Sequence, residues 1–390
     1  MASALRLLPN AERRVRLGHA WIFSNEVDVA RTPLTGFAPG ELAEVFDARG
    51  KPVGVAYVNP GALISARLLS SNIHQEIDVR WFAGRLRRAL ALRERLYPAP
   101  YYRLVYGESD GLPGLVIDRY GDVLVAQLNT AGMHALRVPL LAAIDEVIAP
   151  RGIRVTAAGS VRSMEGLTQA DELLGDVPDI AEVRERDLVL AAPLKGGQKT
   201  GYYFDQRDNR ARIARYAGGK SVLDVYSYVG AWGVSAAKAG ASSVVCVDAS
   251  GPALAFAREN AARNGVALET REGDALDVLA DFASAGSRFD VIIVDPPALV
   301  KRKKDAAAGR AHYERLNRSA LAVLAPDGIL VSCSCSYHMD GPSLQRAILG
   351  AARAENRRAQ LLERHGQPPD HPVHPAIPET EYLKAFFVRA

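Results

Sequence analysis

Residues 221–250, SVLDVYSYVGAWGVSAAKAGASSVVCVDAS, decide the fold. They begin with a β-branched apolar run that ends in Asp224, continue through helix-forming residues to a glycine, and end in a second β-branched run closed by Asp248. Apolar runs of this length that alternate with helical stretches predict parallel strands joined by helices. Helices then cover both faces of a mostly parallel sheet.

The same alternation continues to the C-terminus. After another helical stretch come the strand-like DVIIVDPP (290–297), a helix through LNRSALAVLA (316–325), the strand-like GILVSCS (328–334) and a final strand in YLKAFFVRA (382–390). We therefore expect residues 188–390 to form an α/β domain with a doubly wound, mostly parallel sheet.

Two other regions precede this domain. Residues 1–75 contain short apolar runs broken by Gly, Pro and Asn, which predict a small β-rich domain. Residues 76–187 contain a helical stretch at 81–96 ended by YPAP, a strand pair around the turn at Gly121, and a second helix at 133–149. These elements predict a middle α+β domain, and a chain of 390 residues is too long for one ordinary core.

The composition excludes several classes of protein. No apolar run approaches the ~18 residues that cross a bilayer, and the N-terminus lacks the apolar core of a signal peptide, so we expect a cytoplasmic protein without a membrane partner. Three cysteines cannot build a disulfide framework, and a CxC pair without further ligands is a poor zinc site, so no metal is expected. The net charge of +4 permits a nucleic-acid partner.

Acidic residues end successive strands of the predicted sheet, where ligands of such sheets bind. Asp224 leads through Tyr226 and Ser227 to Gly230, a small-residue turn that lets a ligand approach backbone amides closely. Asp248 ends the next strand and is placed to accept hydrogen bonds from a ribose diol. A helix cap is the alternative for each acid.

Two further acids follow the next strands. Asp274, followed by Ala275, lies where an adenine edge would be read in a nucleoside site, and a plain helix N-cap is the alternative. Asp295 precedes two prolines, which remove backbone donors and hold the acid rigidly at the sheet edge. In a doubly wound order the fifth strand lies beside the fourth, so Asp295 and the residues after the fifth strand converge.

Two cysteines lie at the end of that fifth strand, in VSCSCSYHM (331–339). Cys333 closes the apolar run and Cys246 lies inside the apolar VVCVD, so we expect both to pack as small hydrophobic residues. Cys335 lies beyond the strand, where packing does not favour a thiol. The sequence therefore predicts a chemical role for Cys335 beside Asp295.

Three basic clusters are candidates for contacts with RNA phosphates. Arg13, Arg14 and Arg16 lie in RRVR, Arg85, Arg87 and Arg88 in RLRR, and Lys301, Arg302, Lys303 and Lys304 in KRKK. The alternative for each cluster is a solvated surface. For RLRR the two interpretations have equal weight. Position favours the RNA interpretation for KRKK, because this cluster follows the DPP motif closely and so lies beside the same cleft.

Longer motifs point to a family. The chain contains RLGHAWIFSNEV (16–27), GESDGLPGLVIDRYGD (107–122), GQKTGYYFDQRDNR (197–210), VLDVYSYVGAWGVSAAKAGA, VDPPALV, SCS (334–336) and DHPVHPAIPETEYLKAF (370–386). Together these motifs resemble the ribosomal large-subunit methyltransferase I family. Its members are class I S-adenosylmethionine-dependent enzymes that make 5-methylcytosine in 23S ribosomal RNA, and the resemblance extends over essentially the whole chain.

The resemblance implies an architecture and partners. It implies an N-terminal PUA domain, which is an RNA-binding β-barrel, a middle α+β domain and a Rossmann-like methyltransferase domain. The cofactor would be S-adenosylmethionine, and the partner would be 23S ribosomal RNA or a large-subunit precursor. A homodimer is left open.

The resemblance also implies roles for individual residues. Tyr203, Asp205, Gln206 and Arg207, with the loop after Asp224, would border the methionine portion of the cofactor, while Asp248 would bind the ribose hydroxyls and Asp274 the adenine amino group. Cys335, the central residue of SCS, would be the nucleophile.

A cysteine nucleophile suits cytosine, because carbon 5 is too weakly nucleophilic to take a methyl group unaided. A thiolate that adds to carbon 6 makes the ring an enamine whose carbon 5 attacks the methyl group, and elimination then releases the enzyme. Such a thiol needs a depressed pKa, which nearby cations or backbone donors would supply. Asp295 would hold the ring at nitrogen 3 and the amino group. The base that removes the carbon 5 proton is left open among water, Asp295 and His338.

The motif after the fourth strand departs from two related patterns. Better-known RNA cytosine-5 enzymes carry a second cysteine there, and this chain has none. N6-adenine methyltransferases need an aromatic residue after DPP, and Ala298 supplies no ring. The alternatives are methyl transfer to another base atom, such as a guanine nitrogen, by proximity alone, and an inactive RNA-binding ribosome-assembly factor. The intact Asp248, Asp274 and DPP motif argue against the inactive factor.

Overall fold

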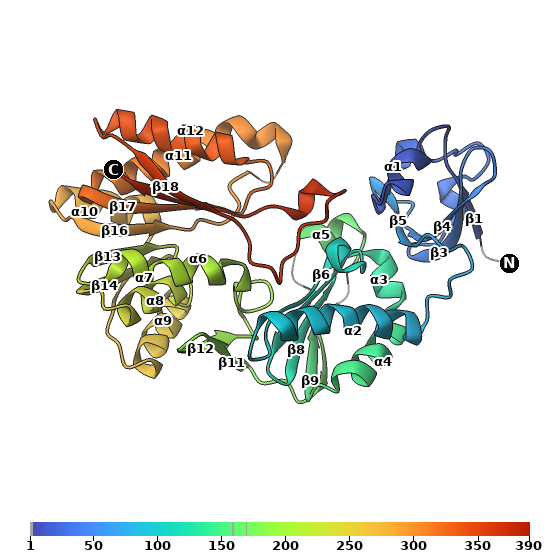
Figure 1. Cartoon of the computed structure of the whole chain (residues 1–390), viewed down its shortest axis with the longest axis horizontal. Coiled ribbons are helices and arrows are strands. Elements are labelled where there is room, and N and C mark those ends of the chain that lie inside the picture. The colour runs from blue at the N-terminus through green and yellow to red at the C-terminus, as the bar shows by residue number, and fades with distance from the viewer. Residues whose placement is uncertain (1–2, 158–159, 169, 301) are drawn as a thin grey trace. The chain divides into compact units, whose positions relative to one another are not determined.

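The computed structural model describes residues 3–157, 160–168, 170–300 and 302–390, which form two compact units (Figure 1). The first unit consists of Met1–Ala181, Pro193–Tyr202 and Pro369–Thr380, and the second of Glu182–Ala192, Tyr203–Pro368 and Glu381–Ala390. The chain therefore passes between the units more than once. The predicted domain boundaries after residues 75 and 187 stay predictions.

The N-terminal part of the first unit is a β-sheet, as predicted. Its strand order is β1-β3-β4-β5-β2, with β1 (Ser3–Arg6), β2 (Trp21–Phe23), β3 (Glu41–Phe46), β4 (Pro52–Val58) and β5 (Ile64–Ser70). The short helix α1 (Glu12–Arg16) carries the RRVR cluster. Leu5, Ile22 and Val45 belong to the apolar core of this sheet.

The rest of the first unit is an α+β layer, also as predicted. Its sheet has the order β10-β9-β8-β7-β6, with β6 (Tyr101–Tyr106), β7 (Leu115–Tyr120), β8 (Val123–Leu128), β9 (Gly152–Val155) and β10 (Glu172–Gly175). The helices are α2 (Val79–Leu96), α3 (Ala131–Ala135), α4 (Arg137–Ile148) and α5 (Ser160–Met164). The single helix predicted at 133–149 is thus two helices. Pro139 explains the break, because its ring would clash with the carbonyl group of Ala135, four residues earlier.

The sheet of the second unit confirms the predicted fold class. Its order is β15-β14-β13-β16-β17-β19-β18, with β13 (Ser221–Val225), β14 (Ser243–Asp248), β15 (Glu269–Glu272), β16 (Phe289–Val294), β17 (Leu324–Ser334), β18 (Gln360–His365) and β19 (Lys384–Arg389). Strands β13 to β17 pair in parallel, whereas β19 runs antiparallel to β17 and β18. Strand β18 was not predicted, because QLLERH has too few apolar residues to distinguish an edge strand from a surface segment.

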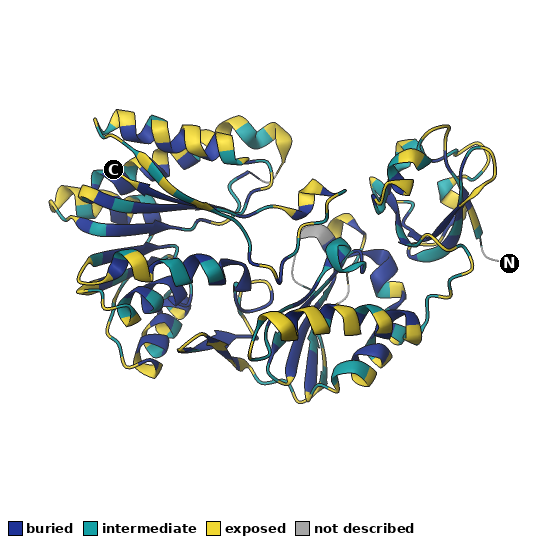
Figure 2. Ribbon diagram, viewed as in Figure 1, coloured by how far each residue is buried: buried dark blue, intermediate teal, exposed yellow. Residues whose placement is uncertain are grey.

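Helices cover both faces of this sheet (Figure 1), and the strands between them are the most buried part of the unit (Figure 2). One face packs against α6 (Arg207–Arg212), α7 (Ala214–Ala217), α8 (Ala231–Lys238) and α9 (Gly251–Arg263), and the other against α10 (Ala275–Ser284), α11 (Ala306–Ala322) and α12 (Gly341–Ala354). Side chains along β13 alternate between the two faces of the sheet. Val222 packs with the first group of helices and Leu223 with the second. Within the described ranges, no helix combines the length and apolarity that crossing a membrane requires.

A reversal of strand order positions the site. Strand β13 lies between β14 and β16, so the chain leaves β13 to one side and later returns on the other. The parallel register pairs Asp224 with Ile293 and Val225 with Val294, so Asp295 follows at the same edge. Ligands of doubly wound sheets bind at such a reversal.

A buried ion pair in the first unit gives a prediction about stability. Arg93 of α2 is fully buried and donates to both carboxylate oxygens of Asp110 (2.6 and 2.7 Å) and to the Asp370 carbonyl oxygen (2.8 Å). Asp110→Ala leaves this charge without its partner, so we expect the free energy of unfolding to fall by about 3–5 kcal/mol in urea denaturation. Glu146→Ala, which removes the exposed pair with Arg87, should cost less than about 1 kcal/mol. Equal losses in the two variants would contradict the prediction.

Candidate active site

The loop after β13 holds strained backbone conformations. Tyr226 (φ 65°), Tyr228 (φ 50°) and Gly230 (φ 76°) all lie in the left-handed region. Such strain costs of order 1 kcal/mol or more at a tyrosine, and it gathers at ligand sites. Gly230 is also required for packing, because a Cβ there would lie 2.6 Å from the Ala257 Cβ. The element that lies close to Gly230 is therefore α9. A cofactor contact at Gly230 stays a prediction.

Asp224 is buried at the base of this loop. Its Oδ2 accepts a hydrogen bond from the Gly233 amide (2.9 Å), and its Oδ1 has no hydrogen-bond partner among the described residues. Burial raises the pKa of Asp224 to about 7. A buried carboxylate oxygen without a donor is costly, and the ammonium group of the methionine portion of S-adenosylmethionine is a donor that would relieve that cost. Asp224, with Ser227 buried in the same loop, therefore fits the cofactor that the sequence predicts.

Asp248 is the last residue of β14 and Asp274 follows β15, and each accepts hydrogen bonds from nearby backbone amides. Asp248 is half-buried and accepts hydrogen bonds from the Tyr228 amide and the Ser250 amide (2.9 Å each). The N-cap of α9 is Ser250, so the alternative interpretation of Asp248 as a helix cap is wrong. Asp274 is exposed and caps α10, which begins at Ala275, by accepting from the Leu276 amide (2.8 Å). Roles of Asp248 and Asp274 toward a ribose and an adenine stay predictions.

The segment Tyr203–Arg207 lies against both the β13 loop and Asp295. The Tyr203 ring contacts the Tyr228 ring edge-on at 5.5 Å. The Gln206 amide nitrogen donates to both carboxylate oxygens of Asp295 at 3.0 Å, and the Gln206 Oε1 accepts from Asn209 (2.7 Å). Gln206 therefore positions Asp295, which the sequence did not predict.

Two other members of this segment are buried. Asp205 accepts a hydrogen bond from the Tyr382 hydroxyl group (2.6 Å), and the Arg207 guanidinium lies 5.2 Å from the centre of the Phe204 ring. Both side chains thus shape the wall of the site. Contacts of Asp205 and Arg207 with the methionine portion of a cofactor stay predictions.

Asp295 is a half-buried carboxyl group with an altered proton affinity. Besides the bonds from Gln206, it accepts one from the Trp232 indole nitrogen (3.1 Å). Burial raises the pKa of Asp295 to about 6, against the effect of these donors. A carboxyl group that titrates near neutral pH is suited to general acid–base work. Trp232 was not predicted, although its place in GAWG, directly after the β13 loop, was a signal.

The three cysteines lie in different surroundings, as predicted. Cys246 and Cys333 are fully buried, and burial raises the pKa of each well above that of a free thiol. Cys335 follows the end of β17 and is half-buried, with its Sγ 3.9 Å from the Pro296 carbonyl oxygen. The predicted convergence of Cys335 with the Asp295-Pro296 segment is therefore confirmed.

Lys384 is a polar residue of this region that the sequence did not predict. It lies on β19 opposite Ser334, and its ammonium group donates to the Ser336 carbonyl (2.6 Å) and the Tyr382 carbonyl (2.7 Å). Burial lowers the pKa of Lys384 to about 8, while the neighbouring Cys335 acts in the opposite direction. A lone lysine in the apolar run LKAFFV was the available signal.

The predicted RNA-binding clusters are only partly available to a ligand. Arg14 is paired with Glu26 (2.7 Å), Arg16 with Asp47 (3.2 Å) and Arg302 with Asp305 (2.8 Å). Arg13, Lys303 and Lys304 are exposed and have no ion pair with any residue in the described ranges, whereas Lys301 lies outside those ranges. His338, a candidate base, packs edge-on against the Tyr337 ring at 5.2 Å.

Comparisons with known proteins agree with this architecture. A PUA-like domain family matches residues 5–71, and an S-adenosylmethionine-dependent methyltransferase family matches residues 166–389. A crystal structure of a putative methyltransferase complexed with SAH is similar over 100% of both chains, with a TM-score of 0.85 at 21% identity. A putative SAM-dependent methyltransferase from Streptococcus mutans gives a TM-score of 0.83 over 99% of this chain and 100% of that one, also at 21% identity. Both show the same fold.

Curated relatives are similar over the full length. The chain is 36% identical to "Ribosomal RNA large subunit methyltransferase I" of Photobacterium profundum over 99% of both chains. It is 37% identical to the protein of the same name from Shewanella denitrificans over 100% of both. With its PUA-like and methyltransferase domains, the chain belongs to the ribosomal RNA large subunit methyltransferase I family of S-adenosylmethionine-dependent enzymes.

Proposed function

We propose that this protein methylates carbon 5 of a cytidine in large-subunit ribosomal RNA, with Cys335 as a covalent nucleophile. The observation that carries the proposal is the position of Cys335 beside the Asp295-Pro296 segment, while Cys246 and Cys333 are fully buried. The RNA substrate is supported by the names of the full-length relatives. The PUA-like domain and the exposed Lys303 and Lys304 support the same substrate, and the cytoplasm is the matching location.

The cofactor would bind at the carboxyl ends of β13, β14 and β15. When bound, S-adenosylmethionine supplies a methyl group on a positively charged sulfur. Asp224 and Ser227 would hold its amino-acid end, because the Asp224 Oδ1 is buried and lacks a donor among the described residues. Asp248 would accept hydrogen bonds from the ribose, and Asp274 from the adenine amino group, while each keeps its backbone partners.

The nucleophile needs its thiolate form, and Lys384 is placed to favour it. The Lys384 ammonium is held by two carbonyl groups next to Cys335 and interacts with its charge. A cation near a thiol stabilises the thiolate relative to the thiol. We assign Lys384 as a residue that positions positive charge beside the nucleophile.

Asp295 would act on the cytosine ring. As the thiolate forms a bond to carbon 6, electrons move from the carbon 5–carbon 6 bond into the ring, and Asp295 in its protonated form donates to nitrogen 3. Once carbon 5 carries the methyl group, it loses its proton to a base, the sulfur–carbon bond breaks, and nitrogen 3 returns its proton to Asp295. A pKa of about 6 suits Asp295 to give and recover this proton. The overall reaction releases one proton.

The nucleophile is tested by separating the two cysteines of SCSCS. Cys335→Ala should abolish methyl transfer and keep cofactor binding, because the thiol is needed for chemistry alone. Cys333→Ala should keep most activity, because Cys333 is fully buried and packs in the core. With RNA that contains 5-fluorocytidine, protein with Cys333→Ala should form a covalent adduct and protein with Cys335→Ala should not, as seen on denaturing gels. An active Cys335→Ala enzyme would refute the nucleophile and favour methyl transfer to another atom, such as a guanine nitrogen.

The role of Lys384 is tested by the pH dependence of alkylation. Lys384→Met removes a positive charge, so the pKa of the Cys335 thiol should rise by about one unit. The rate of iodoacetamide reaction, followed by mass spectrometry of the Cys335 peptide, should then reach its midpoint at higher pH. The difference should fade above pH 8, where the wild-type lysine, whose pKa is about 8, loses its own charge. Lys384→Arg should restore much of the shift, and a midpoint that does not move would refute the role.

The cofactor site is tested at Asp248. Asp248→Ala removes charge-assisted hydrogen bonds to a ribose, each of roughly 1.5–3 kcal/mol, so affinity for S-adenosylmethionine should fall at least about tenfold in calorimetry. Asp281→Ala, an exposed acid near the far end of α10 that pairs with Arg271, is the control and should bind normally. Equal affinity of the Asp248→Ala protein and the wild type would remove Asp248 from the site.

A further inference from the structure

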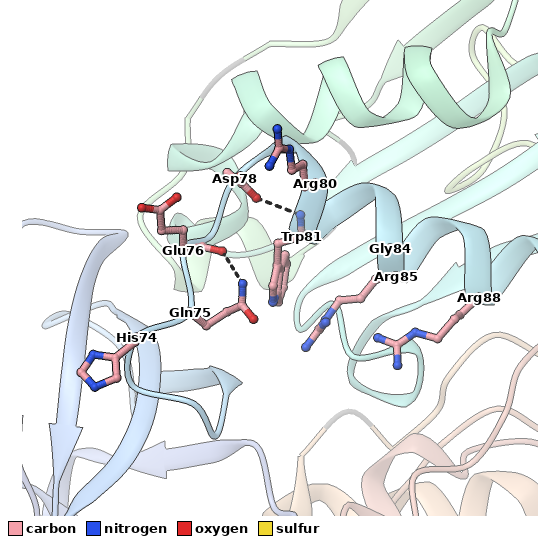
Figure 3. Close-up of a pocket in the computed structure, with 9 residues that line it drawn as sticks. All are labelled: His74, Gln75, Glu76, Asp78, Arg80, Trp81, Gly84, Arg85 and Arg88. Carbon is pink, nitrogen blue, oxygen red and sulfur yellow. Dashed lines mark hydrogen bonds between the residues drawn. The ribbon is translucent and has the colours of Figure 1, made fainter.

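A pocket of about 640 Å³ lies in the first unit, between the loop before α2 and the N-terminal half of that helix (Figure 3). Its lining includes His74, Gln75, Trp81, Arg85 and Arg88. The volume is in the range of small-ligand sites. The residues of the methyltransferase site lie on other elements, so this pocket calls for its own explanation.

Two arginines of this pocket have no ion pair with any described residue. Arg85 and Arg88 extend in the same direction in Figure 3, and neither forms an ion pair with a residue of the described ranges. Two acids line the same pocket, but Asp78 caps α2 by accepting from the Trp81 amide (2.9 Å), and Glu76 points away from the arginines in Figure 3. Burial, together with the charge of Arg88, lowers the pKa of Arg85 to about 10. An anion between the two arginines would relieve their repulsion.

Arg85 is held in a fixed orientation. Its Nε donates to the Gly111 carbonyl (2.9 Å) and its Nη2 to the Leu69 carbonyl (2.8 Å). The guanidinium also lies 3.9 Å from the centre of the Trp81 ring. A guanidinium plane fixed on one side by an aromatic ring is a preformed surface on which an unpaired base can stack.

Trp81 carries a donor that lacks an acceptor. The residue is 6% exposed, and its indole nitrogen is buried without a hydrogen-bond partner among the described residues. Figure 3 shows the nitrogen-bearing end of the ring directed toward the same side as Arg85. A buried indole N–H normally has a partner, so a ligand with acceptor oxygens would complete this site.

Gly84 leaves the helix surface bare at this point. It lies on the exposed face of α2 between Trp81 and Arg88, and a Cβ there would meet no atom within 4 Å. A glycine inside a helix costs roughly 1 kcal/mol relative to alanine, and no packing against the protein requires it. The absence of a side chain keeps the pocket open above Arg85.

We propose that this pocket binds one unpaired nucleotide of the RNA substrate, apart from the nucleotide that is methylated. Arg88 and the Trp81 N–H contact the phosphate, and the base stacks on the Arg85 guanidinium. The proposal uses the RNA substrate of the proposed function and is independent of its cysteine chemistry. It also gives a role to part of the RLRR cluster, for which a solvated surface is the alternative.

The test measures binding of a short single-stranded oligoribonucleotide to the full-length protein by fluorescence anisotropy over a range of salt concentrations. Arg88→Ala should weaken binding and reduce the salt slope by about 0.7 log units for one lost phosphate contact. Arg87→Ala is the matched control, because Arg87 lies on the same helix but is paired with Glu146. It should leave affinity and slope unchanged. The duplex of the same strand should bind less tightly than the single strand, because its bases are not free to stack.

Gly84→Gln separates loss of the site from loss of the fold. A Cβ at this position has no atom within 4 Å, and glutamine favours the helix more than glycine does, so the melting temperature should hold or rise while RNA affinity falls. Trp81→Phe removes the indole N–H together with part of a buried ring, so it should weaken RNA binding and also lower the melting temperature. If Arg88→Ala and Gly84→Gln bind RNA as the wild type does, or if Arg87→Ala weakens binding equally, the pocket is not an RNA site. Binding by the Cys335→Ala protein should match the wild type, so failure of the nucleophile and failure of this pocket are distinguishable.

Discussion

Parallel pairing of β13 with β16 is the constraint on which the site depends. It fixes the carboxyl ends of both strands at one edge of the sheet, so that Asp224, near the end of β13, and Asp295, directly after β16, lie at the same edge. Burial is the main reason that both carboxyl groups have a raised pKa, and the charge of Asp295 adds to the effect at Asp224. Acids gathered in this way are costly unless donors hold them. The surrounding elements supply such donors: the Gly233 amide for Asp224, and Gln206 and Trp232 for Asp295.

The segment GQKTGYYFDQRDNR (197–210) supplies one of these donors, because Gln206 donates to Asp295. The family resemblance predicts that this segment borders the cofactor, and in the structure Gln206 and Asn209 form a chain of hydrogen bonds that ends on Asp295. The rigid prolines after Asp295 and the bond from Gln206 restrict the same side chain from two directions. A carboxyl group fixed in this way, with a pKa near 6, can exchange a proton with a substrate ring without moving far.

Three buried or partly buried cations, Arg93, Lys384 and Arg85, differ in their partners. Arg93 is fully buried and bonded to Asp110, which is the arrangement expected of a structural charge. Lys384 and Arg85 are bonded mainly to carbonyl oxygens, which carry no full charge, so burial lowers the pKa of both side chains. A cation that keeps its charge without an anionic partner can still interact with a ligand. For Lys384 that partner would be the Cys335 thiolate, and for Arg85 an RNA nucleotide.

The sequence by itself determined the fold class, the order of most elements and the end of each strand where an acid stands. It could do so because periodicity and turn residues are local properties of the chain. It also separated Cys335 from Cys333, since the end of an apolar run is visible in one dimension. The single helix predicted over 133–149 was wrong, because Pro139 breaks a helix. Strand β18 was missed, because an edge strand has a weak apolar signal.

Only the tertiary structure decided which polar groups meet. Gln206 and Asp295 are 89 positions apart, and Lys384 and Ser336 are 48 apart, so no spacing rule connects them. The structure also showed that Arg14, Arg16 and Arg302 of the basic clusters have acidic partners, whereas Arg85 and Arg88 have none among the described residues. The physical reason is that the effect of a charge depends on its burial and its nearest neighbours, and both are set by packing between segments that are distant in sequence.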